Sequence, residues 1–144
     1  RKEGDRLVHD RDVSLLKEGR KKATPGGLAL SGDRTKLYVP LADARVVAEL
    51  DAATLTELRA FPTLHLPCDV AVNGDLLAVA DWGGREKEDD EATAKSGTHD
   101  LVVDRDGVMT TGAVTLVNLR DGSTRHVATG RHPAGLAFGG DRLY

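Results

Sequence analysis

The sequence predicts an all-β fold: a β-propeller fragment of four-stranded antiparallel blades, with a long insertion between two strands of one blade. Three observations support this prediction. A short apolar pattern recurs along the chain, the first two copies are separated by the length of one blade, and no long segment has helical periodicity.

The repeated pattern begins with Pro, continues after two residues with an apolar–Ala–apolar triplet, and ends after one spacer with Gly-Asp. Its three copies occupy residues 25–33, 67–75 and 133–141, and a second apolar run follows each copy at 37–39, 77–79 and 143–144. Two short apolar runs joined by a Gly-containing polar turn favour a β-hairpin. The sequence therefore predicts three hairpins in the same structural position.

Each of the first two hairpins is followed by a second half-repeat. Residues 46–54 match residues 113–121 in register, with Val47 opposite Val114 and Asp51 opposite Asn118. A further apolar–polar stretch follows at 56–61 and at 124–128. Each unit thus has four short strands. Residues 42–45 and 55–58 have the composition of helical turns but are too short to count as helices.

The spacing of the repeat divides the chain into blades. Pro25 and Pro67 are 42 residues apart, which matches one four-stranded blade, whereas Pro67 and Pro133 are 66 residues apart. The surplus lies between Trp82 and Gly112. We expect a blade remnant at 1–24, a blade at 25–66, a blade at 67–132 with an insertion at about 82–111, and the start of another at 133–144. Propellers close with several blades, so we expect a longer parent protein.

Composition narrows the function classes. The chain has 144 residues, a formal net charge of −3 and a single cysteine, Cys68, which excludes an internal disulfide and a cysteine zinc cluster. No window has the run of apolar residues that a membrane helix needs, so no membrane span is expected. The near-neutral balance and low aromatic content argue against nucleic acid as a partner. The basic run at 17–22 is interpreted as a solvated strand edge or turn.

Several of these segments resemble a known family. Residues 25–33, 37–40 and 114–119 are similar to the YVTN-type, YncE-like β-propeller repeat, although Glu49 occupies a slot that is apolar in that family. Residues 81–85, 96–98, 102–107 and 112–115 resemble one sub-family, in which the propeller precedes a phosphoesterase domain of the alkaline-phosphatase superfamily. The resemblance covers about residues 20–144.

The resemblance implies a bacterial, periplasmic or secreted parent hydrolase. Its partners would be the remaining blades and a C-terminal phosphoesterase domain, and its hydrolytic metal site would lie outside this segment. No residue here matches the metal ligands or nucleophile of that domain. No catalytic residue and no cofactor are therefore expected in this segment, whereas the parent could hold a divalent metal.

The insertion is the first candidate for a ligand site, the alternative being a flexible surface loop. Trp82 could form a platform for a small-molecule ligand, and the Gly83-Gly84 pair would let backbone approach it closely. The candidate ligand-binding residues are Trp82, Gly83, Gly84, Arg85, Ser96, Gly97 and Thr98. The last three form either a loop turn or a phosphate-binding nest.

A second hypothesis is a lactonase-type hydrolase with a divalent metal in the propeller funnel. Its candidate funnel-lining residues are Asp43, Asp69, Asp81 and His132. The segment from Asp104 to Gly107 reaches glycine too early for a calcium loop, so a hairpin turn is expected there. The histidines have no zinc-motif spacing. The leading hypothesis is a scaffold and binding module, with a nucleic-acid-binding propeller as a third.

Overall fold

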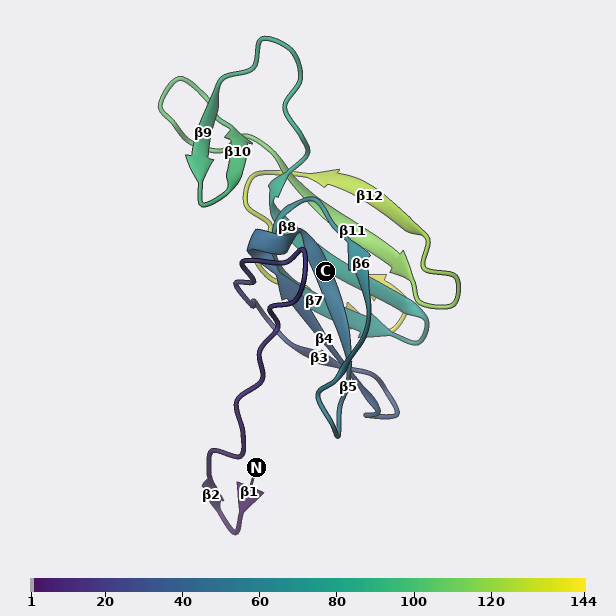
Figure 1. Cartoon of the computed structure of the whole chain (residues 1–144). Helices are drawn as coiled ribbons and strands as arrows, with labels where there is room; N and C mark the ends of the chain where they lie inside the picture. The colour runs from purple at the N-terminus through teal and green to yellow at the C-terminus, as the bar shows by residue number, and fades with distance from the viewer. Residues whose placement is uncertain (1) are drawn as a thin grey trace.

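A computed structural model describes residues 2–144, and its regular structure is almost entirely β (Figure 1). The first sheet has the order β3-β4-β5-β6, formed by Ala29–Leu30, Lys36–Leu41, Val46–Asp51 and Glu57–Pro62. The second has the order β12-β11-β8-β7, formed by His65–Asn73 (β7), Leu76–Gly84 (β8), Gly112–Asn118 (β11) and Thr124–Thr129 (β12). Both sheets are antiparallel throughout, which confirms the all-β prediction of a propeller-like fragment.

The repeated hairpins take the same place in each sheet. Ala29 pairs with Tyr38 in β3–β4, and Val70 pairs with Val79 in β7–β8. Phe138–Gly139 (β13) and Arg142–Leu143 (β14) form the third hairpin. Strand order across each sheet follows chain order, as expected of a blade. Residues 42–44 form a single turn of 3-10 helix, η1, between β4 and β5.

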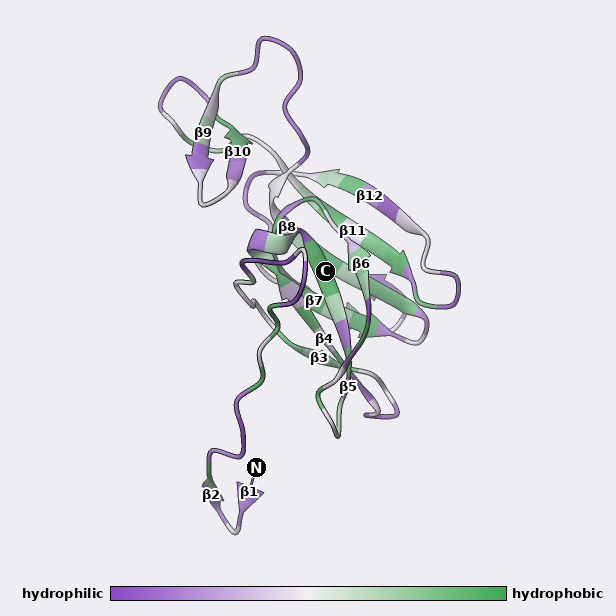
Figure 2. Cartoon of the chain, viewed as in Figure 1, coloured by the Kyte–Doolittle hydropathy of each residue, from purple (hydrophilic) through white to green (hydrophobic). Residues whose placement is uncertain are grey.

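The core follows from the alternation of side chains along these strands. One cluster fills the space between the two sheets, and its buried members are Tyr38, Val47, Phe61, Val70, Leu77, Val79 and Val117. The opposite face of the first sheet carries a second cluster: Val39, Leu41, Ala48 and Leu50, covered by Leu15 and Ala23 among others. Figure 2 shows the apolar colour concentrated on the central strands of both sheets. Each sheet is thus hydrophobic on the faces that it buries.

The innermost strands approach each other closely where the repeats begin. The Gly27 N–H donates to the Cys68 carbonyl over 2.8 Å, and the Leu136 N–H donates to Oδ2 of Asp69 over 2.9 Å. A Cβ atom on Gly26 would overlap the Cys68 carbonyl oxygen. Glycine at this position is therefore required for the two sheets to meet. Asp69 links the second sheet to the chain segment that leads into β13.

The remaining elements lie outside the two sheets. Lys2–Glu3 (β1) and Arg6–Leu7 (β2) form a small hairpin, and Lys17 and Arg20 form an isolated bridge. These are the regular elements within residues 2–24, the described part of the segment 1–24 that the sequence predicts as a blade remnant. None of the described residues forms a helix of the length and apolar character that crossing a bilayer requires.

Candidate functional site

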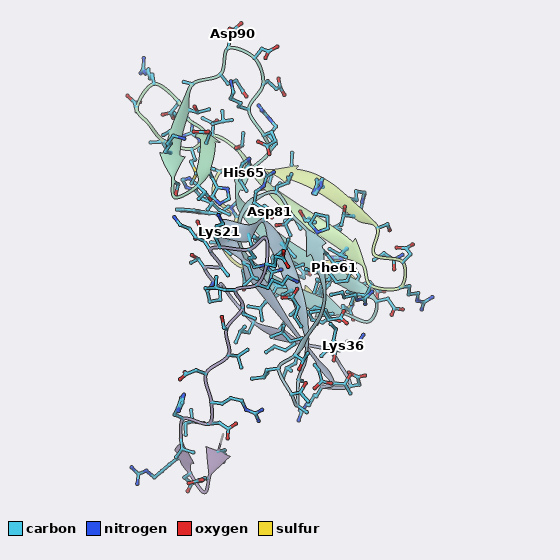
Figure 3. The ribbon with its side chains drawn as sticks, in the orientation of Figure 1. Lys21, Lys36, Phe61, His65, Asp81 and Asp90 are labelled. Carbon is cyan, nitrogen blue, oxygen red and sulfur yellow. The ribbon has the colours of Figure 1, made fainter. Side chains whose placement is uncertain are left out.

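The insertion is a folded hairpin at one end of the second sheet. β8 ends at Gly84 and β11 begins at Gly112, so the connecting segment is 85–111, inside the predicted range. Thr93–Ser96 (β9) pairs with His99–Val102 (β10), and the predicted turn after Val103 closes with the Gly107 N–H donating to the Asp104 carbonyl over 3.0 Å. Figure 1 shows this hairpin projecting beyond the end of β8. Figure 3 places Asp90 at the far end of the same insertion.

Two buried histidines attach the hairpin to the sheet. Nδ1 of His65, at the start of β7, lies 3.0 Å from Nδ1 of His99 in β10, so one ring must donate and the other accept. Nε2 of His65 lies 2.8 Å from Oε2 of Glu86, and Arg45 forms an ion pair with the same carboxylate. The hydrogen bond from His65 is the main cause that lowers the pKa of Glu86. Burial, and then the charge of His65, lower the pKa of His99.

The predicted glycine pair serves this attachment. A Cβ atom on Gly83 would lie 2.7 Å from Cδ2 of Leu101 in β10 and 2.8 Å from Cβ of His65. Gly84 has a φ of +66°, which favours glycine, and a Cβ there would lie 2.7 Å from the Gly112 nitrogen. Gly83 thus lets β8 approach the β9–β10 hairpin closely, and Gly84 lets it approach the segment that enters β11.

The other predicted ligand residues do not gather at one place. Trp82 is 37% exposed and its ring centroid lies 4.8 Å from that of His132. Arg85 donates two hydrogen bonds to Glu91, from Nη1 over 2.7 Å and from Nη2 over 2.6 Å. This pairing occupies the Arg85 guanidinium within the insertion itself.

Thr98 lies elsewhere, in the wall of a hollow that we call the basic hollow. Its volume is about 680 Å³, and it is lined by Lys17–Lys22, Asp43, Ala44, Val46 and Thr98. Lys17 and Arg20 both form ion pairs with Glu57 in β6. Lys21 and Lys22 are exposed, and neither forms an ion pair within the described part of the chain, residues 2–144. The basic run is therefore brought against the turn of the β9–β10 hairpin.

A buried carboxyl group lies at the end of β8. Asp81 has no exposed surface, and no hydrogen bond to its Oδ1 is formed by residues 2–144. Burial raises the pKa of Asp81 to about 7, against the opposing effect of the hydrogen bond from Thr115. Thr115 Oγ1 lies 2.5 Å from Oδ2 of Asp81 and 2.9 Å from Nδ1 of His126. His126, on the outer strand β12, is exposed.

The four funnel candidates each have different partners. Asp43 is in η1 and accepts a hydrogen bond from Thr24, Asp69 accepts from the Leu136 amide, and the His132 ring contacts that of Trp82 at a tilt of 40°. Asp81 is buried beside Thr115, and Asp69 pairs with the adjacent residue Ala80 across the β7–β8 ladder. Over residues 2–144 no three His, Cys, Asp or Glu side chains are grouped in a way that could hold a metal ion.

One polar cluster was missed at the sequence level. Glu49 is buried between the sheets, where its carboxylate contacts Lys36 Nζ at 3.0 Å and Arg59 Nη2 at 2.9 Å. Arg59 also donates to the Leu119 carbonyl of the second sheet over 2.9 Å. The sequence contained a signal for this cluster: antiparallel pairing of the two strands places Glu49 opposite Arg59, and opposite charges in that position form a cross-strand ion pair.

Comparison with known proteins adds little to this geometry. No model of a known protein family matches the chain, and no curated protein matches it. Among solved structures, hydrazine synthase of Kuenenia stuttgartiensis is similar with 17% sequence identity and a TM-score of 0.41. The similarity covers 78% of this chain and 39% of the synthase chain, so the chain spans about two fifths of that protein's length.

Proposed function

We propose that this chain is the binding part of a β-propeller, and that it binds a small anionic ligand in the basic hollow. The observation that carries the proposal is the hollow itself, which joins the segment 17–22 to the turn of the insertion hairpin at Thr98. Two segments about 75 residues apart in the sequence thus share one concave surface. Such a surface, formed by loops on a rigid sheet scaffold, is the usual form of a ligand site.

The charges around the hollow favour an anion. Glu57 pairs with both Lys17 and Arg20, whereas no carboxylate of residues 2–144 forms an ion pair with Lys21 or Lys22. The Thr24 hydroxyl holds Asp43 at the opposite wall, and Oδ1 of Asp43 lies close to Gly97. The lining also contains the carboxylates of Glu18 and Asp43, so its four cationic side chains outnumber its acidic ones. Two unpaired ammonium groups beside the Thr98 hydroxyl are suited to a phosphate or carboxylate group.

The binding proposal is tested by an NMR titration of the 144-residue chain. The chain is titrated with inorganic phosphate and with phenyl phosphate, each at low and at high salt. We expect shifts at Thr98 and the amides of 17–22, with an affinity that falls as salt rises. The double variant Lys21→Gln/Lys22→Gln should lose at least about tenfold in affinity. Lys87→Gln, in the exposed part of the insertion, is the matched control. Equal affinity in both variants would contradict the proposal.

We further propose that the chain is an accessory module to a phosphoesterase domain in a periplasmic or secreted bacterial parent. The resemblance of its motifs to the YVTN-type repeat supports this proposal, as does the anionic character expected of the ligand. The test is a phosphoesterase assay of the full-length parent with and without residues 85–111. An accessory role predicts a higher KM and an unchanged kcat after the deletion. Loss of kcat alone would argue against it.

A further inference from the structure

Three side chains form a continuous hydrogen-bonded row from the interior to the surface of the second sheet. Asp81, Thr115 and His126 come from the neighbouring strands β8, β11 and β12. The pairing Ala113–Asp81 and the pairing Thr115–His126 place all three on one face. The row begins at a carboxyl group with no exposed surface and ends at an exposed imidazole.

The directions of the two hydrogen bonds are fixed by the charge of Asp81. An ionised carboxylate only accepts, so the Thr115 hydroxyl must donate to it. The Thr115 oxygen then accepts from His126, whose Nδ1 must carry the hydrogen. In this state Nε2 of His126 has a free lone pair and no hydrogen. When Asp81 is protonated on Oδ2, that oxygen donates to the Thr115 oxygen, the Thr115 hydroxyl donates to Nδ1 of His126, and Nε2 carries the hydrogen.

We propose that Asp81, Thr115 and His126 form a proton wire, and that Nε2 of His126 is the base of a small-molecule site beside β12. A proton taken up at Nε2 releases the Nδ1 hydrogen to the Thr115 oxygen, and the Thr115 hydroxyl hydrogen passes to Oδ2 of Asp81. One proton has then moved from the ligand to the buried carboxylate. The imidazole is neutral before and after, and the ligand oxygen keeps the bonding electron pair.

The site is a pocket of about 290 Å³ that His126 lines. Its other walls include Leu64, Thr111, Ala113, Ala128 and Arg85. Arg85 is engaged by Glu91, so the pocket presents mainly methyl groups, threonine hydroxyls and the imidazole. This lining suits a small neutral molecule with a hydroxyl group. The pocket shares no residue with the basic hollow, so the inference does not depend on the proposed function.

Few other charged or titratable groups act on the wire. Arg45, which follows η1, favours the ionised form of Asp81, and the Cys68 thiol of β7 lies within electrostatic range of the same carboxyl. Arg85 is the charged residue that shares the pocket with His126. The backbone N–H groups of Leu64 and Thr115 also favour the ionised form, and the Thr115 hydroxyl is the side-chain group that joins Asp81 to His126.

The tautomer of His126 tests the wire directly. In ¹⁵N NMR spectra of the 144-residue chain at about pH 9, where Asp81 is ionised, we expect the Nδ1–H tautomer. Thr115→Val removes the hydroxyl and should convert His126 to the Nε2–H tautomer. Thr115→Ser keeps the hydroxyl and should retain Nδ1–H, as should Thr124→Val, a matched change on β12. An Nε2–H tautomer in the unmodified chain at this pH would overturn the proposal.

The ligand class is tested with two probes of similar shape. Phenol has a hydroxyl hydrogen to donate and anisole has none. We expect phenol to shift the Nε2 resonance of His126 at least several-fold more than anisole does at equal concentration. Equal shifts with the two probes would overturn the assignment of a hydroxyl-binding base.

Discussion

The replacement Asp81→Asn should stabilise the protein progressively as pH rises. Asp81 is fully buried, and its pKa is raised from 3.8 to about 7 because burial disfavours the charged form. Between those two values the folded state binds more protons at this site than the unfolded state. The free energy of unfolding therefore falls as pH rises through this window and is level above it. Asparagine has no proton to lose, so the variant escapes this loss.

The magnitude follows from the difference between the two pKa values. About three pKa units at roughly 1.4 kcal/mol each give a cost of roughly 4 kcal/mol for the ionised form. Relaxation of the surroundings and entry of water reduce this value, so about 2–4 kcal/mol is the expected range. The gain of the variant over the unmodified chain should be smallest near pH 4 and reach this range near pH 8.

The assay is urea denaturation at a series of pH values, followed by the fluorescence of Trp82, the single tryptophan. Asp89→Asn, an exposed carboxylate in the insertion, is the control and should track the unmodified chain at every pH. A stability difference between Asp81→Asn and the unmodified chain that stays constant from pH 4 to pH 8 would refute the reasoning. It would mean that Asp81 titrates alike in the folded and unfolded states.

Three further predictions concern the contacts that join the parts of the chain. Glu49→Ala removes the buried carboxylate that pairs with Arg59 and Lys36, and both of these cations are partly exposed. The free energy of unfolding should therefore fall by about 1–2 kcal/mol in thermal denaturation, and a change near zero would contradict this. Gly26→Ala forces a methyl group against the Cys68 carbonyl and should cost about 2 kcal/mol or more by the same measurement, whereas Gly32→Ala, in open space, should cost much less. Because the pKa of His99 is lowered in the folded state, docking of the hairpin should weaken as pH falls through the ordinary value of 6.5. Amide hydrogen exchange across β10 should therefore accelerate at acidic pH, and His99→Gln should remove this pH dependence. Equal acceleration in the variant and the unmodified chain would count against the prediction.

The strands could be predicted from the sequence because their signals are local. Alternating apolar residues around Gly-Asp turns determine which segments become hairpins, and the matched half-repeats place Val47 and Val114 on corresponding third strands. The single turn of η1 was also visible as a short helical composition at 42–45. The boundaries of the insertion followed from the surplus length of the second unit.

The contacts that define the sites could not be predicted in the same way. His65 and His99 are 34 residues apart, and their meeting depends on how the insertion folds back. From the sequence, His99 lies in the insertion, and no local pattern distinguishes a mobile loop from a hairpin that packs against the sheet. Thr115 was one polar residue of an apolar strand, and its role appears only when β8 and β12 are paired on either side of it.

The segment around residues 15–23 affects how this sheet can meet another one. It covers the face of the first sheet that carries Leu41 and Leu50, and its Lys17 and Arg20 are held by Glu57. A neighbouring blade stacked on that face and this segment would exclude each other. If a further blade were to stack on this side, it would have to displace the segment and break the ion pairs of Glu57. Salt weakens such partly exposed ion pairs, so stacking on this face would become easier as ionic strength rises.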